Sequence, residues 1–117
     1  DIVSINCPLT DKTKGLISKK ILSLMMPNSY IINSSRSEII DEIALVKLLK
    51  EKRIAGAGLD VFSAEKKSNT ELLDLPNTIL IPHMGSATVD GRIEMGEKVI
   101  INIKTFIDGH NPPNRII

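Results

Sequence analysis

Four side chains of catalytic types stand near the ends of apolar runs in this sequence: Arg36, Asp60, Glu65 and His83. An arginine can hold a carboxylate through two parallel hydrogen bonds. A histidine that a nearby carboxylate keeps protonated can give its proton to a carbonyl oxygen while hydride arrives at the carbon. Brought together by a fold, these groups suit the reduction of a carbonyl compound that carries a carboxylate.

The apolar runs before these residues have the length and composition of buried strands. Four such runs predict strands, at residues 2–5, 30–32, 56–61 and 78–81. Apolar residues at helical spacing predict helices over residues 14–25 and 88–107, and a further helix that begins after an N-cap at Asp41. The connection between residues 61 and 78 is long and polar, with room for a short helical turn at 71–75, and such loops are often functional.

Strands that alternate with helices indicate a parallel sheet, because parallel neighbours need crossover connections. The predicted fold class is therefore α/β, with a parallel sheet covered by helices on both faces. The helix after Asp41 is expected to bury Ile43, Leu45, Val46, Leu48 and Leu49. Its predicted solvent face consists of Lys47, Lys50, Glu51 and Lys52. The apolar stripe of the last helix comprises Val89, Ile93, Ile100, Ile103 and Ile107.

In an open parallel sheet all strands end at one edge, and ligands bind in the crevice there. The polar residues that follow the predicted strands should gather at this edge: Asn6, Cys7, Pro8, Asn33, Ser34, Ser35, Arg36, Asp60, His83, Gly85 and Ser86. Glu65, in the long loop, can reach the same edge.

Each candidate also has a purely structural interpretation. A histidine after a strand is often an ordinary surface residue, and an isolated arginine such as Arg36 suits a surface ion pair. Asp60 also suits a cap on the following turn, Glu65 a solvated charge and Cys7 a small turn residue. The convergence of a guanidinium, a carboxylate and an imidazole at neighbouring strand ends favours the functional interpretation.

The composition excludes several classes of function. The 117 residues are 42% hydrophobic, which fits one globular domain. The net charge of +1 is scattered and aromatics make up only 3%, so no partner nucleic acid or anionic membrane is expected. With no apolar run near the ~18 residues that span a bilayer, and no signal peptide, a cytoplasmic protein is expected. The single cysteine, Cys7, excludes an internal disulfide and a cysteine-based metal site, and no metal is predicted.

Six motifs occur along the chain: Asn6-Cys7-Pro8-Leu9-Thr10, Ile32-Asn33-Ser34-Ser35-Arg36, Asp41-Glu42 followed by Ala44-Leu45, Gly56-Ala57-Gly58-Leu59-Asp60-Val61-Phe62, Glu65, and Pro82-His83-Met84-Gly85-Ser86-Ala87-Thr88. In order and spacing they resemble the motifs of the D-isomer-specific 2-hydroxyacid dehydrogenases. The resemblance implies a two-domain enzyme with a doubly wound, Rossmann-like NAD(P)-binding domain. Residues 1–117 would form the C-terminal portion of that domain, and residues 88–117 a long helix and tail that return toward a substrate domain.

The resemblance also implies a role for each candidate. Arg36 would bind the carboxylate and carbonyl of a 2-oxo acid, and His83 would be the acid in reduction and the base in oxidation. Glu65 would hydrogen-bond His83 and keep it protonated. Asp60 would lie beside the nicotinamide and its ribose. Other implied cofactor contacts are Ser34, Ser35, Arg36, His83, Gly85 and Ser86 at the nicotinamide end, with Cys7 and Pro8 nearer the adenosine.

The sequence departs from this family in three places. Ser37 stands where a glycine usually follows the arginine, and Lys66 and Lys67 follow the glutamate in place of a proline. The glycine-rich phosphate loop, the residue that selects NAD or NADP, and the substrate domain would all lie before Asp1. Residues 56–58 do not replace that loop, because their glycines lie inside a strand and the third glycine is missing.

Two functions follow from the resemblance. The first is hydride transfer between NAD or NADP and a small 2-oxo acid, glyoxylate or hydroxypyruvate, in a longer protein that forms a homodimer and whose isolated 117 residues are inactive. The second is an NAD(H)-sensing binding module, similar to transcriptional corepressors of the same fold, without significant turnover. Motifs in these residues do not separate the two. An apolar sheet face should remain exposed where the rest of the sheet belongs, and should favour association.

Overall fold

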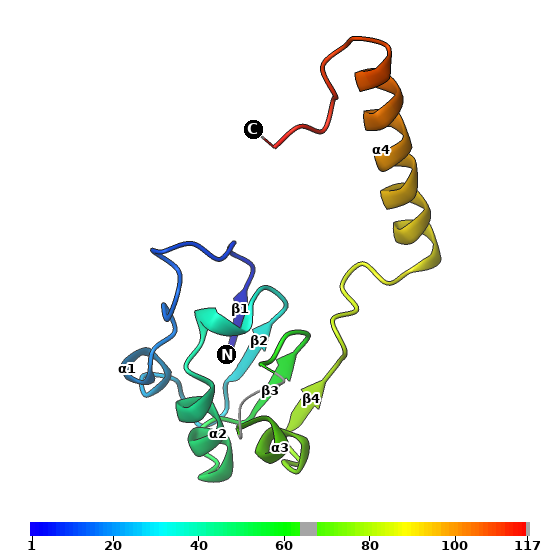
Figure 1. Ribbon diagram of the computed structural model, residues 1–117. Coiled ribbons are helices and arrows are strands. Elements are labelled where there is room, and N and C mark those ends of the chain that lie inside the picture. Colours follow the sequence, from blue (N-terminus) through cyan, green and yellow to red (C-terminus); the bar gives the residue numbers. More distant parts are fainter. Residues whose placement is uncertain (64–67, 117) are drawn as a thin grey trace. The chain divides into compact units, whose positions relative to one another are not determined.

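The computed structural model describes residues 1–63 and 68–116, with side chains described outside residues 64–69 and 117. These residues fall into two units, Asp1–His83 and Met84–Ile117, and each is described by itself. The first unit contains β1 (Ile2–Ile5), α1 (Lys19–Leu22), β2 (Tyr30–Asn33), a 3₁₀ turn η1 (Ser37–Ile39), α2 (Glu42–Lys50), β3 (Gly56–Leu59), α3 (Ser68–Leu73) and β4 (Thr78–Leu80) (Figure 1). The second unit contains α4 (Val89–Ile107).

The sheet consists of four parallel strands in the order β1-β2-β3-β4. Crossovers of one hand that always step in the same direction place their connecting helices on the same face of a sheet. Accordingly, α2 packs between α1 and α3. The α/β class, the parallel sheet and the flanking helices are confirmed, and all four strands end at one edge.

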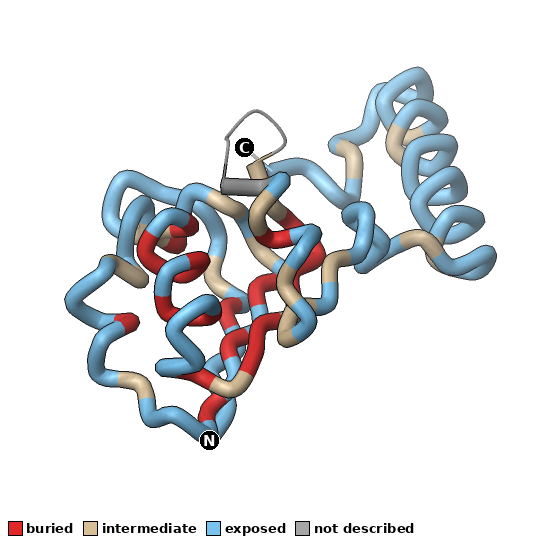
Figure 2. The backbone as a smooth tube through the Cα atoms, turned by 90° about the horizontal axis from the view of Figure 1, so that it is seen from below, coloured by how far each residue is buried: buried red, intermediate tan, exposed pale blue. Residues whose placement is uncertain are grey.

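The core lies between the helices and one face of this sheet. Along β2, Ile31 and Asn33 are fully buried while Tyr30 and Ile32 are exposed, as expected for side chains that alternate between faces. The buried residues gather in the sheet and helices of this unit (Figure 2). The largest apolar side chains buried there are Leu22, Ile31, Ile39, Leu45, Leu49, Ile54, Leu59 and Leu72. Each stabilises the fold by about 1.5–3 kcal/mol through burial.

The opposite face of the sheet carries exposed apolar side chains. Ile2 is 69% exposed and Ile79 is 71% exposed. Gly56 lies between them and has no room for a side chain, because an added Cβ would stand 2.8 Å from the Asn77 carbonyl oxygen. Within this unit, helices therefore cover one face of the sheet, where coverage of both was expected. The predicted exposed apolar face is present, and association through it stays a prediction.

The first predicted helix, over residues 14–25, is much shorter in the structure. Gly15 has a left-handed backbone with φ +66, and its N–H donates to the Glu38 carbonyl at 2.9 Å. Ile17 forms a parallel β-bridge with Ile40. These contacts hold residues 15–17 out of a helix, and α1 comprises only Lys19–Leu22, so the periodicity argument was wrong at both ends of the predicted range.

The cap at Asp41 is confirmed, because its side chain accepts from the Ala44 N–H at 3.0 Å. One expected core residue of α2 lies outside: Ile43 is 72% exposed. It shares its helix face with Lys47 and Lys50, four and seven residues further on, which are exposed as predicted. In the long connection, α3 begins three residues before the predicted turn.

In the second unit, α4 matches its predicted range to one residue. The Thr88 hydroxyl caps it by accepting from the Gly91 N–H at 3.0 Å. None of the residues of α4, all of which the structure describes, is buried, so its apolar stripe is exposed. The tail folds back on α4, where the Asn114 N–H donates to the Asn102 side chain at 3.1 Å. No helix among the described residues is long and apolar enough to cross a membrane.

Candidate active site

Backbone hydrogen bonds continue past the strand ends and align three loops at the carboxyl edge of the sheet. The Asp60 N–H donates to the Asn33 carbonyl at 2.9 Å, and the His83 N–H donates to the Asp60 carbonyl at 3.1 Å. Asn33, Asp60 and His83 therefore form a row across the ends of β2, β3 and β4. This row continues the register of the parallel strands, in which Asn33 pairs with Leu59 and Leu59 pairs with Leu80.

A cleft of about 350 Å³ lies at this edge. Its lining comprises Arg36, Ser37, Glu38, Asp60, Val61, Phe62, Pro82 and His83. Three of the four catalytic types found in the sequence, Arg36, Asp60 and His83, thus border one cavity. The fourth, Glu65, lies outside the described residues. Arg36 and His83 are exposed while Asp60 is buried, so the two groups proposed to meet the substrate are the accessible ones.

The loop that carries Arg36 is built around the side chain of Asn33. Asn33 is 0% exposed, and its Nδ2 donates to the Arg36 carbonyl at 2.9 Å while its Oδ1 accepts from the Ser35 N–H at 3.0 Å. Such a side chain imitates a backbone turn. The Arg36 Nη1 donates to the Ser35 carbonyl at 2.8 Å. Ser37, which departs from the family pattern, begins η1 with a negative φ, so a glycine is not required there.

The hydroxyls of the same loop connect it to the loop after β1. The Ser35 hydroxyl donates to the Cys7 carbonyl, and the Ser34 hydroxyl donates to the Asn6 side chain at 3.3 Å. Cys7, Ser34 and Ser35, predicted as cofactor contacts together with the adjacent Pro8, thus lie together at the edge. Their binding role stays a prediction, because these hydroxyls have partners within the protein.

The remaining predicted contacts, Gly85 and Ser86, belong to the second unit. They lie within a turn in which the Ala87 N–H donates to the Met84 carbonyl at 3.0 Å. Their predicted place beside the cofactor stays a prediction.

His83 has an unusual backbone conformation. Its φ is +52, in the left-handed region that few residues other than glycine adopt. Its N–H is held by the Asp60 carbonyl and, at 3.0 Å, by the Ile81 carbonyl. Residues held in such conformations cluster at functional sites, because the surroundings must offset the strain. The backbone thus gives a physical argument for His83 that does not depend on any motif.

Sequence reasoning missed the role of two buried polar residues, Asn33 and Glu42, which hold loops that border the cleft. Glu42 is 3% exposed, and its Oε1 accepts from the Ser63 N–H at 3.0 Å, which fixes the loop after β3. For Asn33 a signal existed, since an asparagine that ends an apolar run favours a side-chain turn. For Glu42 there was none, because a glutamate in the first turn of a helix is ordinary.

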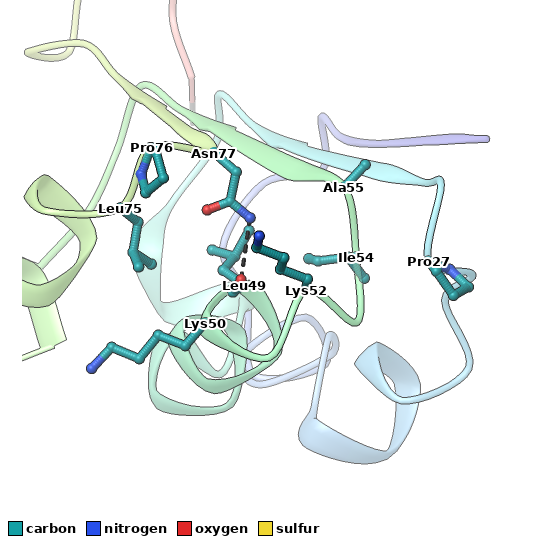
Figure 3. Close-up of a pocket in the computed structure, with 9 residues that line it drawn as sticks. All are labelled: Pro27, Leu49, Lys50, Lys52, Ile54, Ala55, Leu75, Pro76 and Asn77. Carbon is teal, nitrogen blue, oxygen red and sulfur yellow. Dashed lines mark hydrogen bonds between the residues drawn. The ribbon is translucent and has the colours of Figure 1, made fainter.

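A second cleft, of about 430 Å³, lies at the opposite edge of the sheet (Figure 3). Two lysines, Lys50 and Lys52, contribute to its lining, and Asn77 donates from Nδ2 to the Leu49 carbonyl at 3.2 Å. Lys50 is already bonded to Glu71 at 2.9 Å. This cleft precedes β3 and β4, away from the carboxyl edge where such sheets bind ligands. The carboxyl cleft is therefore the candidate active site.

The residues at the carboxyl edge fit one end of a dinucleotide. β1 runs into Asn6-Cys7-Pro8 with no glycine-rich turn into a helix, so the described residues hold no cradle for a pyrophosphate. Hydroxyl, carboxylate and backbone groups at the ends of β2 and β3 suit a polar ring and a sugar. Among the described residues no group of three or more His, Cys, Asp or Glu can hold a metal ion.

Comparisons with known proteins identify the family of this chain. Residues 1–85 match the family described as D-isomer specific 2-hydroxyacid dehydrogenase, NAD binding domain. A glyoxylate reductase of Thermococcus litoralis is 48% identical over 116 residues, which cover 99% of this chain and 35% of that protein. The chain thus spans about a third of the length of the curated relatives it matches.

Solved structures extend the likeness to the fold. An NADPH-dependent glyoxylate/hydroxypyruvate reductase of Sinorhizobium meliloti, solved with NADP and malonate, matches with a TM-score of 0.84 and 38% identity, covering 92% of this chain and 34% of that one. A D-lactate dehydrogenase of Lactobacillus jensenii, solved with NAD⁺, matches with a TM-score of 0.90 and 28% identity, covering 97% and 38%. The chain belongs to the NAD-binding domain family of the D-isomer specific 2-hydroxyacid dehydrogenases, as the motifs predicted.

Proposed function

We propose that this chain is the C-terminal portion of the dinucleotide-binding domain of a longer dehydrogenase, which transfers hydride between NAD(P)H and a small 2-oxo acid. The observation that carries the proposal is the cleft that Arg36 and His83 share at the carboxyl edge of the sheet. Glyoxylate or hydroxypyruvate is the proposed substrate, because the relatives named above include reductases of these compounds.

Three side chains are assigned to the reaction. The Arg36 guanidinium holds the carboxylate of the 2-oxo acid through two hydrogen bonds, which orients the carbonyl in the cleft. His83 donates a proton to the carbonyl oxygen during reduction and removes it during oxidation. Glu65 hydrogen-bonds His83 and favours its protonated form. A bound nicotinamide supplies or accepts the hydride.

Both NAD and NADP remain candidates for the cofactor, since the relatives include structures solved with each. Asp60, at the end of β3, is assigned to the nicotinamide ribose, and Ser34 and Ser35 to the same end of the cofactor. The full-length protein is proposed to be a homodimer, and the 117 residues alone to lack activity.

The decisive experiment measures turnover in the full-length protein that carries this chain. NADH or NADPH is mixed with a panel of 2-oxo acids, and the absorbance of the reduced nicotinamide is followed. We expect turnover of roughly 1–10³ s⁻¹ with glyoxylate or hydroxypyruvate. Methylglyoxal, a 2-oxo aldehyde without a carboxylate for Arg36, is the control and should react far more slowly. Tight binding of the cofactor with negligible turnover on every acid would instead support the NAD(H)-sensing module.

A further inference from the structure

We infer that Asn33 is the positioning residue of Arg36, and that it sets the place of the guanidinium in the cleft. The inference rests on the proposed function, because it assigns Arg36 to the substrate carboxylate. Asn33 itself is fully buried and lies outside the lining of the cleft, so it acts through Arg36.

The side-chain amide of Asn33 holds its own loop with both its nitrogen and its oxygen. Its donor serves the Arg36 carbonyl at 2.9 Å, and its acceptor serves the Ser35 N–H at 3.0 Å. A buried amide that loses its partners is costly, so the loop and the side chain stabilise one another. Burial on this scale also leaves the amide out of reach of a ligand, which separates a positioning role from a binding role.

Arg36 depends on this anchor because regular structure does not fix it. Its backbone is extended, with φ −145 and ψ 142, between the end of β2 and the start of η1. Its carbonyl accepts two bonds, one from the Asn33 side chain and one at 3.3 Å from the Ile39 N–H. Without the shorter of these bonds, only the longer one at the 3₁₀ turn holds the Arg36 carbonyl.

The same residue connects the arginine loop to the histidine. The Asn33 carbonyl accepts from the Asp60 N–H, and the Asp60 carbonyl accepts from the His83 N–H. Asn33 thus holds the Arg36 loop with its side chain and the row that leads to His83 with its backbone. A change of this side chain should disturb the position of the guanidinium relative to the imidazole while leaving the backbone row in place.

The test is a double-mutant cycle in the full-length protein with glyoxylate as substrate. Asn33→Ala should raise the KM for glyoxylate about tenfold, because the two-pronged contact of Arg36 needs a fixed orientation of the guanidinium. Arg36→Lys should raise KM as well. The double variant should be no worse than Arg36→Lys alone, because a misplaced loop matters only when it carries the guanidinium.

Asn77→Ala is the matched control for loss of a side-chain bond. It also removes an amide that donates to a backbone carbonyl, that of Leu49, but at the opposite edge of the sheet (Figure 3). This variant should lower stability and leave KM unchanged.

Asn33→Asp adds a second readout, the pH dependence of KM, which a merely structural role of Asn33 would not change. This variant also tests the inference if Asn33→Ala does not fold. A protonated carboxyl can donate to the Arg36 carbonyl and accept from the Ser35 N–H, whereas a carboxylate can only accept. Burial raises the pKa of a carboxyl group, and position 33 is fully buried. The ratio of the KM of this variant to the KM of the unaltered protein should therefore fall toward one as the pH is lowered from about 8 to about 5.

The outcomes separate the inference from the proposed function. If Arg36→Lys raises KM but the two effects multiply in the double variant, Asn33 is only structural and the inference is overturned. A KM of Asn33→Asp that keeps a constant ratio to the unaltered protein across this pH range would overturn it too. If Arg36→Lys leaves KM unchanged, the assignment of Arg36 to the carboxylate fails, and the inference falls with it.

Discussion

The two edges of the sheet carry clefts of similar size, and each contains one non-glycine residue with a left-handed backbone. His83 borders the cleft at the carboxyl edge, Lys52 borders the one at the opposite edge, and both have φ +52. The conformation is therefore the same at both edges. The contacts that hold it differ between the two edges.

At the opposite edge the conformation follows from the end of a helix. The Lys52 N–H donates to the Leu49 carbonyl at 3.1 Å, and the Arg53 N–H donates to the Leu48 carbonyl at 2.8 Å. This pair of bonds is the Schellman motif, in which the first residue past the cap adopts the left-handed conformation. Lys52 thus satisfies carbonyls at the end of α2, and its side chain is not needed for that purpose.

At the carboxyl edge His83 does not follow a helix. His83 follows Pro82 after β4, and its N–H is shared between the carbonyls of Asp60 and Ile81. One of these bonds is local and the other reaches the end of the neighbouring strand β3, so a tertiary contact helps to hold the conformation, and residues held in this way cluster at functional sites. A glycine would adopt this backbone more easily, so the presence of histidine points to a use for the ring.

The largest expected contrast between the edges concerns turnover. In the full-length protein, His83→Gln should lower kcat by roughly 10² to 10⁴, because glutamine cannot transfer a proton, while the Kd of the cofactor stays nearly constant. Lys52→Gln, the matched change at the opposite edge, should leave kcat within about twofold. Steady-state rates with glyoxylate measure both. Undiminished turnover in His83→Gln would remove this residue from the mechanism.

The second contrast concerns substrate affinity. Arg36→Lys should raise the KM for glyoxylate by roughly 10 to 100-fold with a smaller effect on kcat, because a point charge cannot copy the two-pronged contact. At the opposite edge, Lys50→Arg replaces a cation that pairs with Glu71 at 2.9 Å and should leave KM unchanged. An equal KM for the Arg36 variant and the unaltered protein would mean that Arg36 has a structural role.

Much of this arrangement was predictable from local patterns. The four strands, the cap at Asp41 and the long final helix follow from apolar runs and capping residues, which act over a few positions. The carboxyl edge followed from topology, because parallel strands must end together. The sequence was therefore sufficient to predict that Arg36, Asp60 and His83 lie at one edge.

The features that were missed depend on contacts between distant segments. Ile17 pairs with Ile40 across more than twenty positions, and this bridge overrides helical periodicity in its segment. The exposure of Ile43 reflects where α2 meets the sheet, which the spacing of leucines alone does not fix. The His83 N–H donates to the Asp60 carbonyl at the end of the neighbouring strand, and this contact has no local signal in the sequence.

The smallest expected effect sharpens the comparison most, because it separates stability from activity. Lys52→Gly and His83→Gly each place the residue best suited to a left-handed backbone at a position that has one, and each should relieve about 1 kcal/mol of strain. The greater freedom of glycine in the unfolded chain offsets part of this gain, so the free energy of unfolding should rise by less than about 1 kcal/mol in both variants. Urea denaturation of the full-length protein measures the change.

The turnover of the same two variants should differ. Lys52→Gly should keep full turnover while His83→Gly loses it, which would show that the protein keeps a histidine at a position where glycine fits the backbone better. A His83→Gly variant that is clearly less stable than the unaltered protein would mean that the imidazole ring stabilises the fold through its packing. The two edges would then differ in side-chain packing and not in catalytic function.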